Sequence, residues 1–372
     1  MNQNVPVRFL ALDVFRGLTI CFMIIVNTGG PNPFPELRHA QWNGFTLTDL
    51  VFPSFLFAVG NAISFSKSKW EQQPAGSVIT KILKRTVLLF IIGYLMYWLP
   101  FIKVDPQNHI LPFPIGETRI FGVLQRIALC YGIGALIIYF FPRRTILYTC
   151  AGLLLGYWLL AALFGDYTLN GAAATKLDIL TLTRPHLYKK GPENAFDPEG
   201  LLSTLPAIVN VLIGYLAGIH IKKNPKSYEM LAQLAIAGFA LLSIGYLWNL
   251  VFPINKKLWT SSFVCLTTGL DCLIIAAILY IVDFKGKRAG VTFFEVFGKN
   301  ALFIYLLSEV IPILLSSFYT ADKQSIFNYL YTITYGQLGA GHLPSLLWAV
   351  SFMLFCWLAG YFLYKRKIFI RL

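Results

Sequence analysis

The chain has 372 residues, of which 56% are hydrophobic and only 13% are charged. Soluble domains carry roughly 25% charged residues, so this composition excludes an ordinary soluble globular protein. The net charge of +14 would suit a nucleic-acid-binding protein, but the basic residues gather in short segments between every second pair of apolar runs. That distribution is typical of the cytoplasmic ends of membrane helices. We therefore expect a lipid bilayer around the chain and no nucleic-acid partner.

Apolar runs of about 20 residues recur along the chain, which is the length of helix that crosses ~30 Å of hydrocarbon. Lipid leaves helices as the only open structure with a satisfied backbone. We therefore predict an all-α, polytopic membrane bundle, with residues 1–372 as one transmembrane domain. The ten predicted spans are residues 9–28, 46–66, 83–101, 119–141, 145–164, 201–221, 230–252, 259–282, 293–318 and 345–364.

An eleventh span around residues 325–341 is possible but weakly apolar. Ten spans, or ten and a re-entrant piece, agree better with the charge distribution, because an even number returns the chain to the side on which it started. The basic residues near the end of the chain, Lys365, Arg366 and Lys367, predict that this side is the cytoplasm. Both termini are therefore expected there.

The first predicted span carries three polar residues. Asp13 and Arg16 lie near its cytoplasmic end and Asn27 near its outer end. Arg16 and Asn27 are expected on one face of the helix, about 16 Å apart at 1.5 Å per residue. One helix could thus present a cation toward the cytoplasm and an amide toward the outside. The alternative is that Asp13 and Arg16, three residues apart, only pair with each other at the membrane surface.

The loop after this span, with the start of the second span, reads ELRHAQWNGFTLTDLVFP, from Glu36 to Pro53. Trp42 and an Asn-Gly turn follow His39, and such a loop is expected to fold over the mouth of the bundle. An unperturbed histidine can act as a general base for an amine or hydroxyl. Asp49 suits the first turn of the second span as a helix cap, and it is also a candidate site residue.

Further polar residues fall inside or beside later spans. Arg126 is either structural or a ligand of a phosphate or carboxylate, and Asp49, Asp271 and Glu309 are its candidate partners. Asn255 and Lys256 are expected on the outer face, against the usual charge bias, which favours a polar or anionic ligand there. Asn300, in the ninth span with Glu309, is a candidate supporting residue.

The six cysteines all lie in apolar runs without the spacing of metal ligands. We therefore expect buried, reduced thiols and no metal site.

Six stretches, in order, carry a resemblance: RFLALDVFRGLTI with VNTGG, HAQWNGFTLTDLVFPSFLFAVG, GVLQRIALCY, DPEGLLSTLPAIVNVLIG, PINKKLWTSSFV and GKNALFIYLLSE. Together they resemble the heparan-α-glucosaminide N-acetyltransferase family of transmembrane acetyltransferases. The match runs from residue 8 to about residue 309. Against the lysosomal form, we expect a member without the extra luminal N-terminal domain, and the loop has one additional residue between Asn27 and His39.

The resemblance implies transfer of an acetyl group from cytosolic acetyl-CoA to an amino sugar across the membrane. It implies that His39 is the catalytic histidine and that Asn27 has a catalytic role, and it implies a possible homodimer. It also leads us to expect a bacterial member, in the inner membrane. From the residues we expect the CoA phosphates near basic groups such as Arg16. The candidate cofactor-binding residues are Arg16, Arg126, Asn255 and Lys256. The candidate substrate-binding or supporting residues are Asp13, Trp42, Asp49, Asp271, Asn300 and Glu309.

Two other functions stay open from the residues. The same buried charges could bind a solute in a transporter for an amino sugar, or the chain could acylate a hydroxyl group of an envelope glycan. Direct transfer and a two-step route through acetyl-histidine are both compatible with the sequence.

Overall fold

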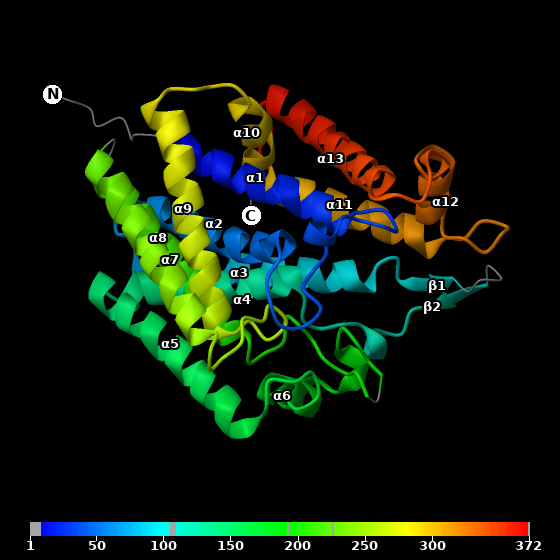
Figure 1. Cartoon of the computed structure of the whole chain (residues 1–372), viewed down its shortest axis with the longest axis horizontal. Helices are drawn as coiled ribbons and strands as arrows, with labels where there is room; N and C mark the ends of the chain where they lie inside the picture. Colours follow the sequence, from blue (N-terminus) through cyan, green and yellow to red (C-terminus); the bar gives the residue numbers. More distant parts are fainter. Residues whose placement is uncertain (1–8, 105–108, 192, 225–226, 371–372) are drawn as a thin grey trace.

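The computed structural model describes residues 9–104, 109–191, 193–224 and 227–370. Within these ranges the regular secondary structure is almost entirely helical (Figure 1). The prediction that both termini are cytoplasmic concerns residues 1–8 and 371–372, which lie outside the described residues. The resemblance begins at residue 8, which belongs to the first of these ranges.

The long helices are α1 Leu10–Asn27, α2 Leu47–Trp70, α3 Ala75–Trp98, α4 Val123–Phe140, α5 Arg143–Phe164, α7 Thr204–Lys223, α8 Tyr228–Trp248, α9 Ser261–Leu279, α11 Ala301–Ser317 and α13 His342–Lys365. Shorter helices are α6 Ala173–Leu182, α10 Val291–Lys299 and α12 Ile326–Thr334, and a π-helical turn, Tyr280–Phe284, continues α9. Two short antiparallel strands, β1 Ile102–Val104 and β2 Ile110–Pro112, form a hairpin after α3.

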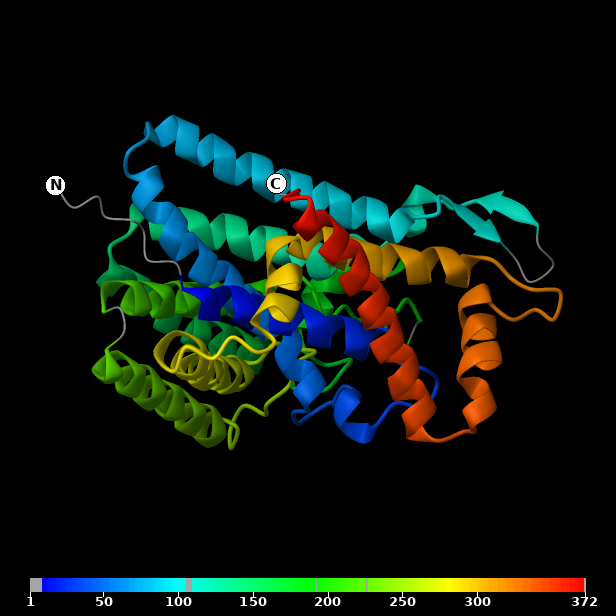
Figure 2. The same cartoon turned by 90° about the horizontal axis from the view of Figure 1, so that it is seen from above.

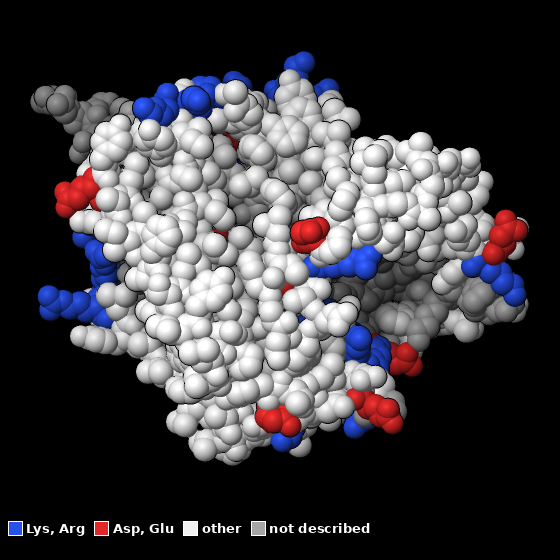
Figure 3. Space-filling view, viewed as in Figure 1, with Lys and Arg blue, Asp and Glu red and all other residues white. Residues whose placement is uncertain are grey.

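Eight described helices are long and apolar enough to cross a membrane. They are α1, α2, α4, α5, α7, α8, α9 with its π-helical turn, and α13, and each matches a predicted span to within four residues at either end. The predicted span at 83–101 corresponds to α3, which is not among the eight. Most of the face shown in Figure 3 is uncharged, and its charged side chains lie at the edges and in a patch to the right of the centre, as expected where charges avoid lipid.

The predicted span at 293–318 is not a single straight helix. The chain forms α10 and α11 instead, with a bend of 80° between them. Asn300 lies at the break, where its side-chain amide donates to the carbonyl of Ile368 at 3.1 Å and its carbonyl oxygen accepts from the N–H of Ile370 at 3.0 Å. The end of the chain therefore supplies partners to a residue that leaves the helix, which hydropathy alone does not reveal.

The weakly apolar segment considered as an eleventh span contains α12, which has nine residues. A helix of that length rises about 14 Å, too little to cross ~30 Å of hydrocarbon. Figures 1 and 2 show α12 at the edge of the molecule, beside the start of α13.

A close contact inside the bundle joins α2 and α7, which are the most buried of the candidate spans among the described residues. A Cβ on Gly60 would lie 1.9 Å from the carbonyl oxygen of Val211, and one on Gly214 would lie 2.1 Å from that of Phe57. These glycines let the two backbones touch, as small residues do between membrane helices. The pair holds the start of α2, and with it the site described below.

This contact predicts that Gly60→Ala destabilises the protein by about 1–3 kcal/mol, because an added methyl group has no space. Gly156→Ala in α5 is the matched control, since nothing lies within 4 Å of a Cβ there, and it should leave stability equal or slightly higher. Thermal unfolding of the purified protein in detergent measures both. Equal melting temperatures for the two variants would contradict the proposed close contact.

Candidate active site

The loop between α1 and α2 is docked against two other loops. The indole N–H of Trp42 donates to the carbonyl of Tyr167 at 2.8 Å, and its ring packs edge-on to Phe196, with centroids 6.3 Å apart. The N–H of Gly44 donates to the carbonyl of Ile254 at 2.8 Å, from a backbone φ of +110° that favours glycine. The expectation that this loop folds over the bundle is therefore confirmed.

The turn before α9 packs against the loop that carries His39, and the buried side chain of Asn255 holds this turn together. Its side-chain oxygen accepts from the N–H of Leu258 at 2.9 Å, and its backbone N–H donates to the hydroxyl of Thr260 at 3.0 Å. Its amide also donates to the side-chain oxygen of Asn43 at 3.1 Å. Asn255, a predicted cofactor ligand, thus uses its side chain to join the turn to the loop that carries His39.

His39 and Asp49 meet at this junction. Nδ1 of His39 lies 2.8 Å from Oδ1 of Asp49, and the carboxylate is buried, with 1% of the side chain exposed against 48% for the histidine. The second oxygen, Oδ2, accepts from the N–H of Ala40, the N–H of Thr46 and the Thr46 hydroxyl, each at 3.1 Å. Thr46 is the N-cap of α2, so the predicted capping is confirmed.

This arrangement determines how the imidazole is presented. When a neutral ring donates from Nδ1 to a carboxylate, Nε2 carries the free lone pair. The half-exposed ring can then offer Nε2 to a proton donor, while the buried carboxylate maintains the ring's orientation. A histidine oriented by a carboxylate is the usual arrangement of a general base.

Lys256 lies at the same histidine. Its Nζ is 3.1 Å from Nδ1 of His39, 3.4 Å from Nε2 and 3.8 Å from Oδ1 of Asp49. Burial lowers the pKa of Lys256, and the carboxylates of Asp49 and Glu199 oppose that change. Sequence reasoning considered Lys256 a ligand of the cofactor; the structure places it beside His39.

Asn27 and Glu309 are joined as well. Nδ2 of Asn27, at the end of α1, donates to Oε1 of Glu309 in α11 at 2.9 Å. The two residues were predicted separately, 282 positions apart, and the structure brings them together. An amide carries two N–H donors, so this contact uses only one of them.

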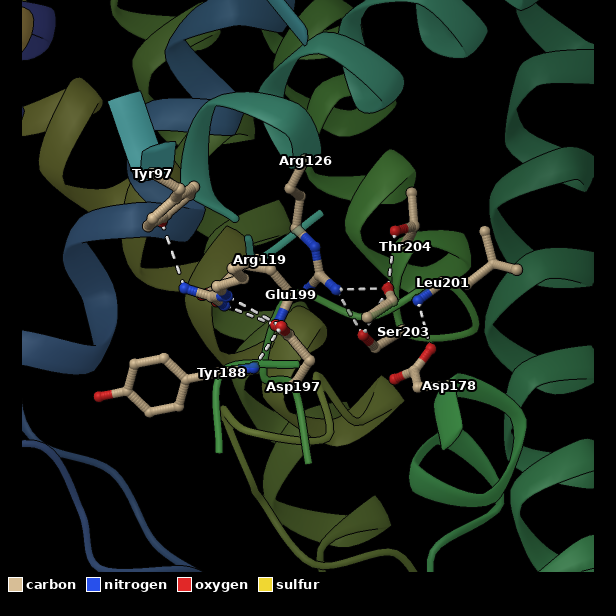
Figure 4. Close-up of polar contacts among 11 residues, drawn as sticks. Tyr97, Arg119, Arg126, Asp178, Tyr188, Asp197, Glu199, Leu201, Ser203 and Thr204 are labelled. Carbon is tan, nitrogen blue, oxygen red and sulfur yellow. Dashed lines mark hydrogen bonds and ion pairs between the residues drawn. The ribbon is translucent and has the colours of Figure 1, made fainter. Parts of the chain in front are cut away.

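A cluster that the sequence did not reveal is centred on Arg119 (Figure 4). The guanidinium donates to Asp197 at 2.8 and 2.5 Å, to Glu199 at 2.5 Å and to the hydroxyl of Tyr97 at 3.2 Å. It also stacks over the ring of Tyr188, 4.7 Å from its centroid. Burial favours neutral groups, but Asp197 and Glu199 outweigh it and raise the pKa of Arg119. Charged residues beside two separate apolar runs were the available signal.

Arg126 is fully buried next to this cluster (Figure 4). Its Nη2 donates to the carbonyl of Gly200 at 2.9 Å and to the hydroxyl of Ser203, and its guanidinium lies 5.0 Å from the ring of Trp259. Among the described contacts none joins it to Asp49, Asp271 or Glu309, so the predicted pairing is wrong. Its partners come from the loop before α7. Hydropathy marked this loop only as the start of a span and gave no sign of the contact.

The remaining predicted residues lie elsewhere. Asp13 and Arg16 pair at 2.9 Å near the start of α1, and Asp271 in α9 accepts from Ser54 in α2 at 2.5 Å. Within the described ranges no group of three or more His, Cys, Asp or Glu residues could hold a metal ion, and the six cysteines are buried and unbridged.

Comparison with known proteins identifies the chain's relatives. Residues 8–248 match the family described as heparan-alpha-glucosaminide N-acetyltransferase, catalytic. The chain belongs to this family. It is 28% identical over 421 residues to the heparan-alpha-glucosaminide N-acetyltransferase of Homo sapiens and 30% identical over 421 residues to that of Mus musculus. These alignments cover 98% and 97% of the chain but 60% of each relative's length.

The family match covers only part of the site. Asn27, His39, Asp49 and the Arg119 cluster lie inside residues 8–248, whereas Lys256 and Glu309 come from beyond them. The alignments to the human and mouse members of the family nevertheless extend over nearly the whole chain. The site is thus assembled from both parts of the sequence.

Next to Arg126, the loop before α7 also rests on a buried carboxyl in α6. Asp178 is fully buried, its Oδ1 accepts from the N–H of Leu201 at 2.8 Å, and its Oδ2 has no hydrogen-bond partner among the described residues. Burial raises the pKa of Asp178 to about 7; the Leu201 hydrogen bond opposes this change and the charge of Asp197 adds to it.

This pKa predicts a stability that falls with rising pH. A carboxyl with a raised folded-state pKa stabilises the fold fully below its unfolded value near 4, and the contribution is lost as pH rises to about 7, by about 1.4 kcal/mol per unit. Asp178→Asn should flatten thermal stability between pH 5 and 7.5. Asp166→Asn, at an exposed carboxyl in the loop between α5 and α6, is the control and should keep the wild-type slope. An unchanged slope in Asp178→Asn would refute the assignment.

Proposed function

We propose that the chain is a transmembrane acetyltransferase that moves the acetyl group of cytosolic acetyl-CoA to the amine of a glucosamine-like amino sugar on the extracytoplasmic face. The proposal rests on the family to which the chain belongs and on one observation of geometry. That observation is the half-exposed His39 imidazole, oriented by buried Asp49 at 2.8 Å in a loop docked over the bundle.

The donor would lie along α1. Arg16 is partly exposed near the start of this helix, with 29% of its side chain accessible, and it suits the CoA phosphates toward the cytoplasm. Asn27 lies about 16 Å further along, which is of the order of a pantetheine arm. Arg126 is less suited to phosphates, because it is fully buried and already donates to Gly200 and Ser203.

In the reaction, His39 would take a proton from the acceptor amine through Nε2 as the nitrogen attacks the thioester carbonyl. Asn27, whose amide has a second N–H beyond the bond to Glu309, would donate to the carbonyl oxygen as negative charge develops there. The C–N bond forms, the C–S bond breaks, and the proton on the imidazole passes to the leaving thiolate. An acetyl-histidine route would use the same two residues in two steps.

The same proposal includes the cellular setting. The enzyme would lie in a bacterial inner membrane with both termini in the cytoplasm, and homodimerisation is carried over from the family resemblance. On this orientation the His39 loop, the turn before α9 and the Arg119 cluster all face the outside, where an acceptor sugar would enter.

Removing the base tests the chemistry. His39→Ala should lower the rate of acetyl transfer by about 10²–10⁴-fold, while acetyl-CoA binding, followed by thermal shift, stays near wild type. His109→Ala, at an exposed histidine in the hairpin loop, should retain full activity. Absence of acetyl-CoA binding to the wild-type protein would refute the transferase, and full turnover in His39→Ala would refute the role of the histidine.

The acceptor and the alternative functions need a separate assay. With labelled acetyl-CoA, glucosamine-type amines should be acetylated at least tenfold faster than the corresponding N-acetylated sugars, which offer hydroxyl groups only. Faster labelling of the hydroxyl acceptors would favour an O-acyltransferase. In proteoliposomes, movement of labelled amino sugar without acetyl-CoA would favour a transporter.

A further inference from the structure

Lys256 and His39 lie in direct contact at the site. The ammonium of Lys256 lies 3.1 and 3.4 Å from the two ring nitrogens of His39. Nδ1 faces Asp49, so in the neutral ring it is the donor to that carboxylate. Lys256 therefore contacts Nδ1 as a neighbouring charge, and Nε2 is the nitrogen that can accept its hydrogen bond.

Lys256 does not hold this place as a mobile surface lysine would. Only 17% of its side chain is exposed, and its backbone belongs to the turn that Asn255 organises. Its carbonyl accepts from the N–H of Trp259 at 3.0 Å, and Trp259 itself is fully buried with a φ of +54°. The well-packed turn thus holds the Lys256 ammonium next to His39.

The charges around the pair decide which of the two holds a proton. Asp49 from α2 supplies one negative charge at contact distance, Glu199 from the loop before α7 acts on Lys256 from further away, and Lys257 adds a positive charge. Arg38, next to His39 in the chain, is engaged with Pro33 and Asn32. One carboxylate in contact balances one cation, and two cations within 3.4 Å repel each other strongly.

We infer that Lys256 is a positioning residue whose ammonium keeps the His39 imidazole neutral between turnovers and hastens the departure of the proton that the imidazole accepts. Lysine is ordinarily the stronger base of the two, and the Asp49 carboxylate, 3.8 Å from Nζ, favours its charged form against the effect of burial, so we assign the positive charge to Lys256. The part of this inference that concerns turnover rests on the proposed acetyl transfer. The effect on protonation does not.

During transfer, the imidazole would carry the proton from the acceptor amine only briefly. An imidazolium next to the Lys256 ammonium is unfavourable, so the proton passes to the CoA thiolate released as the C–S bond breaks. No net proton is gained or lost by the site, and Lys256 remains an ammonium throughout. Asp49 has the opposite effect on the imidazolium, so the two groups together set when His39 is protonated.

The first experiment needs no activity. The NMR signal of the His39 ring is followed against pH in labelled protein in detergent, and His39→Gln assigns it. The proteins compared are the wild type, Lys256→Met, Lys256→Arg and the control Lys323→Met. Lys323 is an exposed lysine of the loop before α12. In Lys256→Met the midpoint of the titration should move up by about one to three pH units. Lys256→Arg and Lys323→Met should titrate as the wild type does. An unmoved midpoint in folded Lys256→Met overturns the inference.

The second experiment tests turnover. If Lys256 acts through His39, the acid limb of the kcat/KM profile in Lys256→Met moves to higher pH, with loss of about tenfold or more at pH 6.5, and Lys256→Arg restores it. A higher KM for acetyl-CoA with an unmoved acid limb would identify a CoA ligand and overturn the role. If the proposed function is wrong, the wild type shows no acetyl transfer. The NMR experiment then decides by itself whether Lys256 controls the protonation of His39. Thermal unfolding confirms that the variants fold.

Discussion

One buried carboxylate, Asp49, connects the fold to the site. Its Oδ2 caps the first turn of α2 through Thr46 and receives the N–H of Ala40, while its Oδ1 faces His39. A carboxylate at a helix N-terminus is also favoured by the helix dipole. The helix thus stabilises the charge that orients the histidine, and the α2–α7 contact at Gly60 and Gly214 holds the helix.

Around this carboxylate the outer face is built from three loops that are far apart in the sequence. The His39 loop docks on the segment around Tyr167 and on the turn at Ile254, and Arg119 joins the segment before α4 to Asp197 and Glu199 in the loop before α7 (Figure 4). Burying charges is costly unless they are paired, and each buried guanidinium or carboxylate here has at least one polar partner. The loops therefore form a compact polar layer on an apolar bundle.

Hydropathy predicted most of the bundle because a span must satisfy its backbone internally and be apolar over ~20 residues. Hydropathy failed where an apolar segment does not form one continuous helix. The α10–α11 segment is apolar enough to pass for one span, but Asn300 leaves the helix where Ile368 and Ile370 supply its hydrogen bonds. The partners of Arg126 were missed because hydropathy does not report contacts between distant residues. Gly200 and Ser203 lie 74 and 77 residues further along the chain.

The sequence by itself determined the helical membrane class, the positions of most spans, the family resemblance and the polar residues at the span ends, His39, Asn27 and Asp49 among them. These are local properties of composition and order. Only the tertiary structure decided which of these residues meet. It paired Asn27 with Glu309, moved Lys256 from a presumed cofactor ligand to the side of His39, and revealed the cluster of Arg119 with Asp197 and Glu199. Contacts between loops depend on how distant helices pack, and no spacing along one chain encodes that distance.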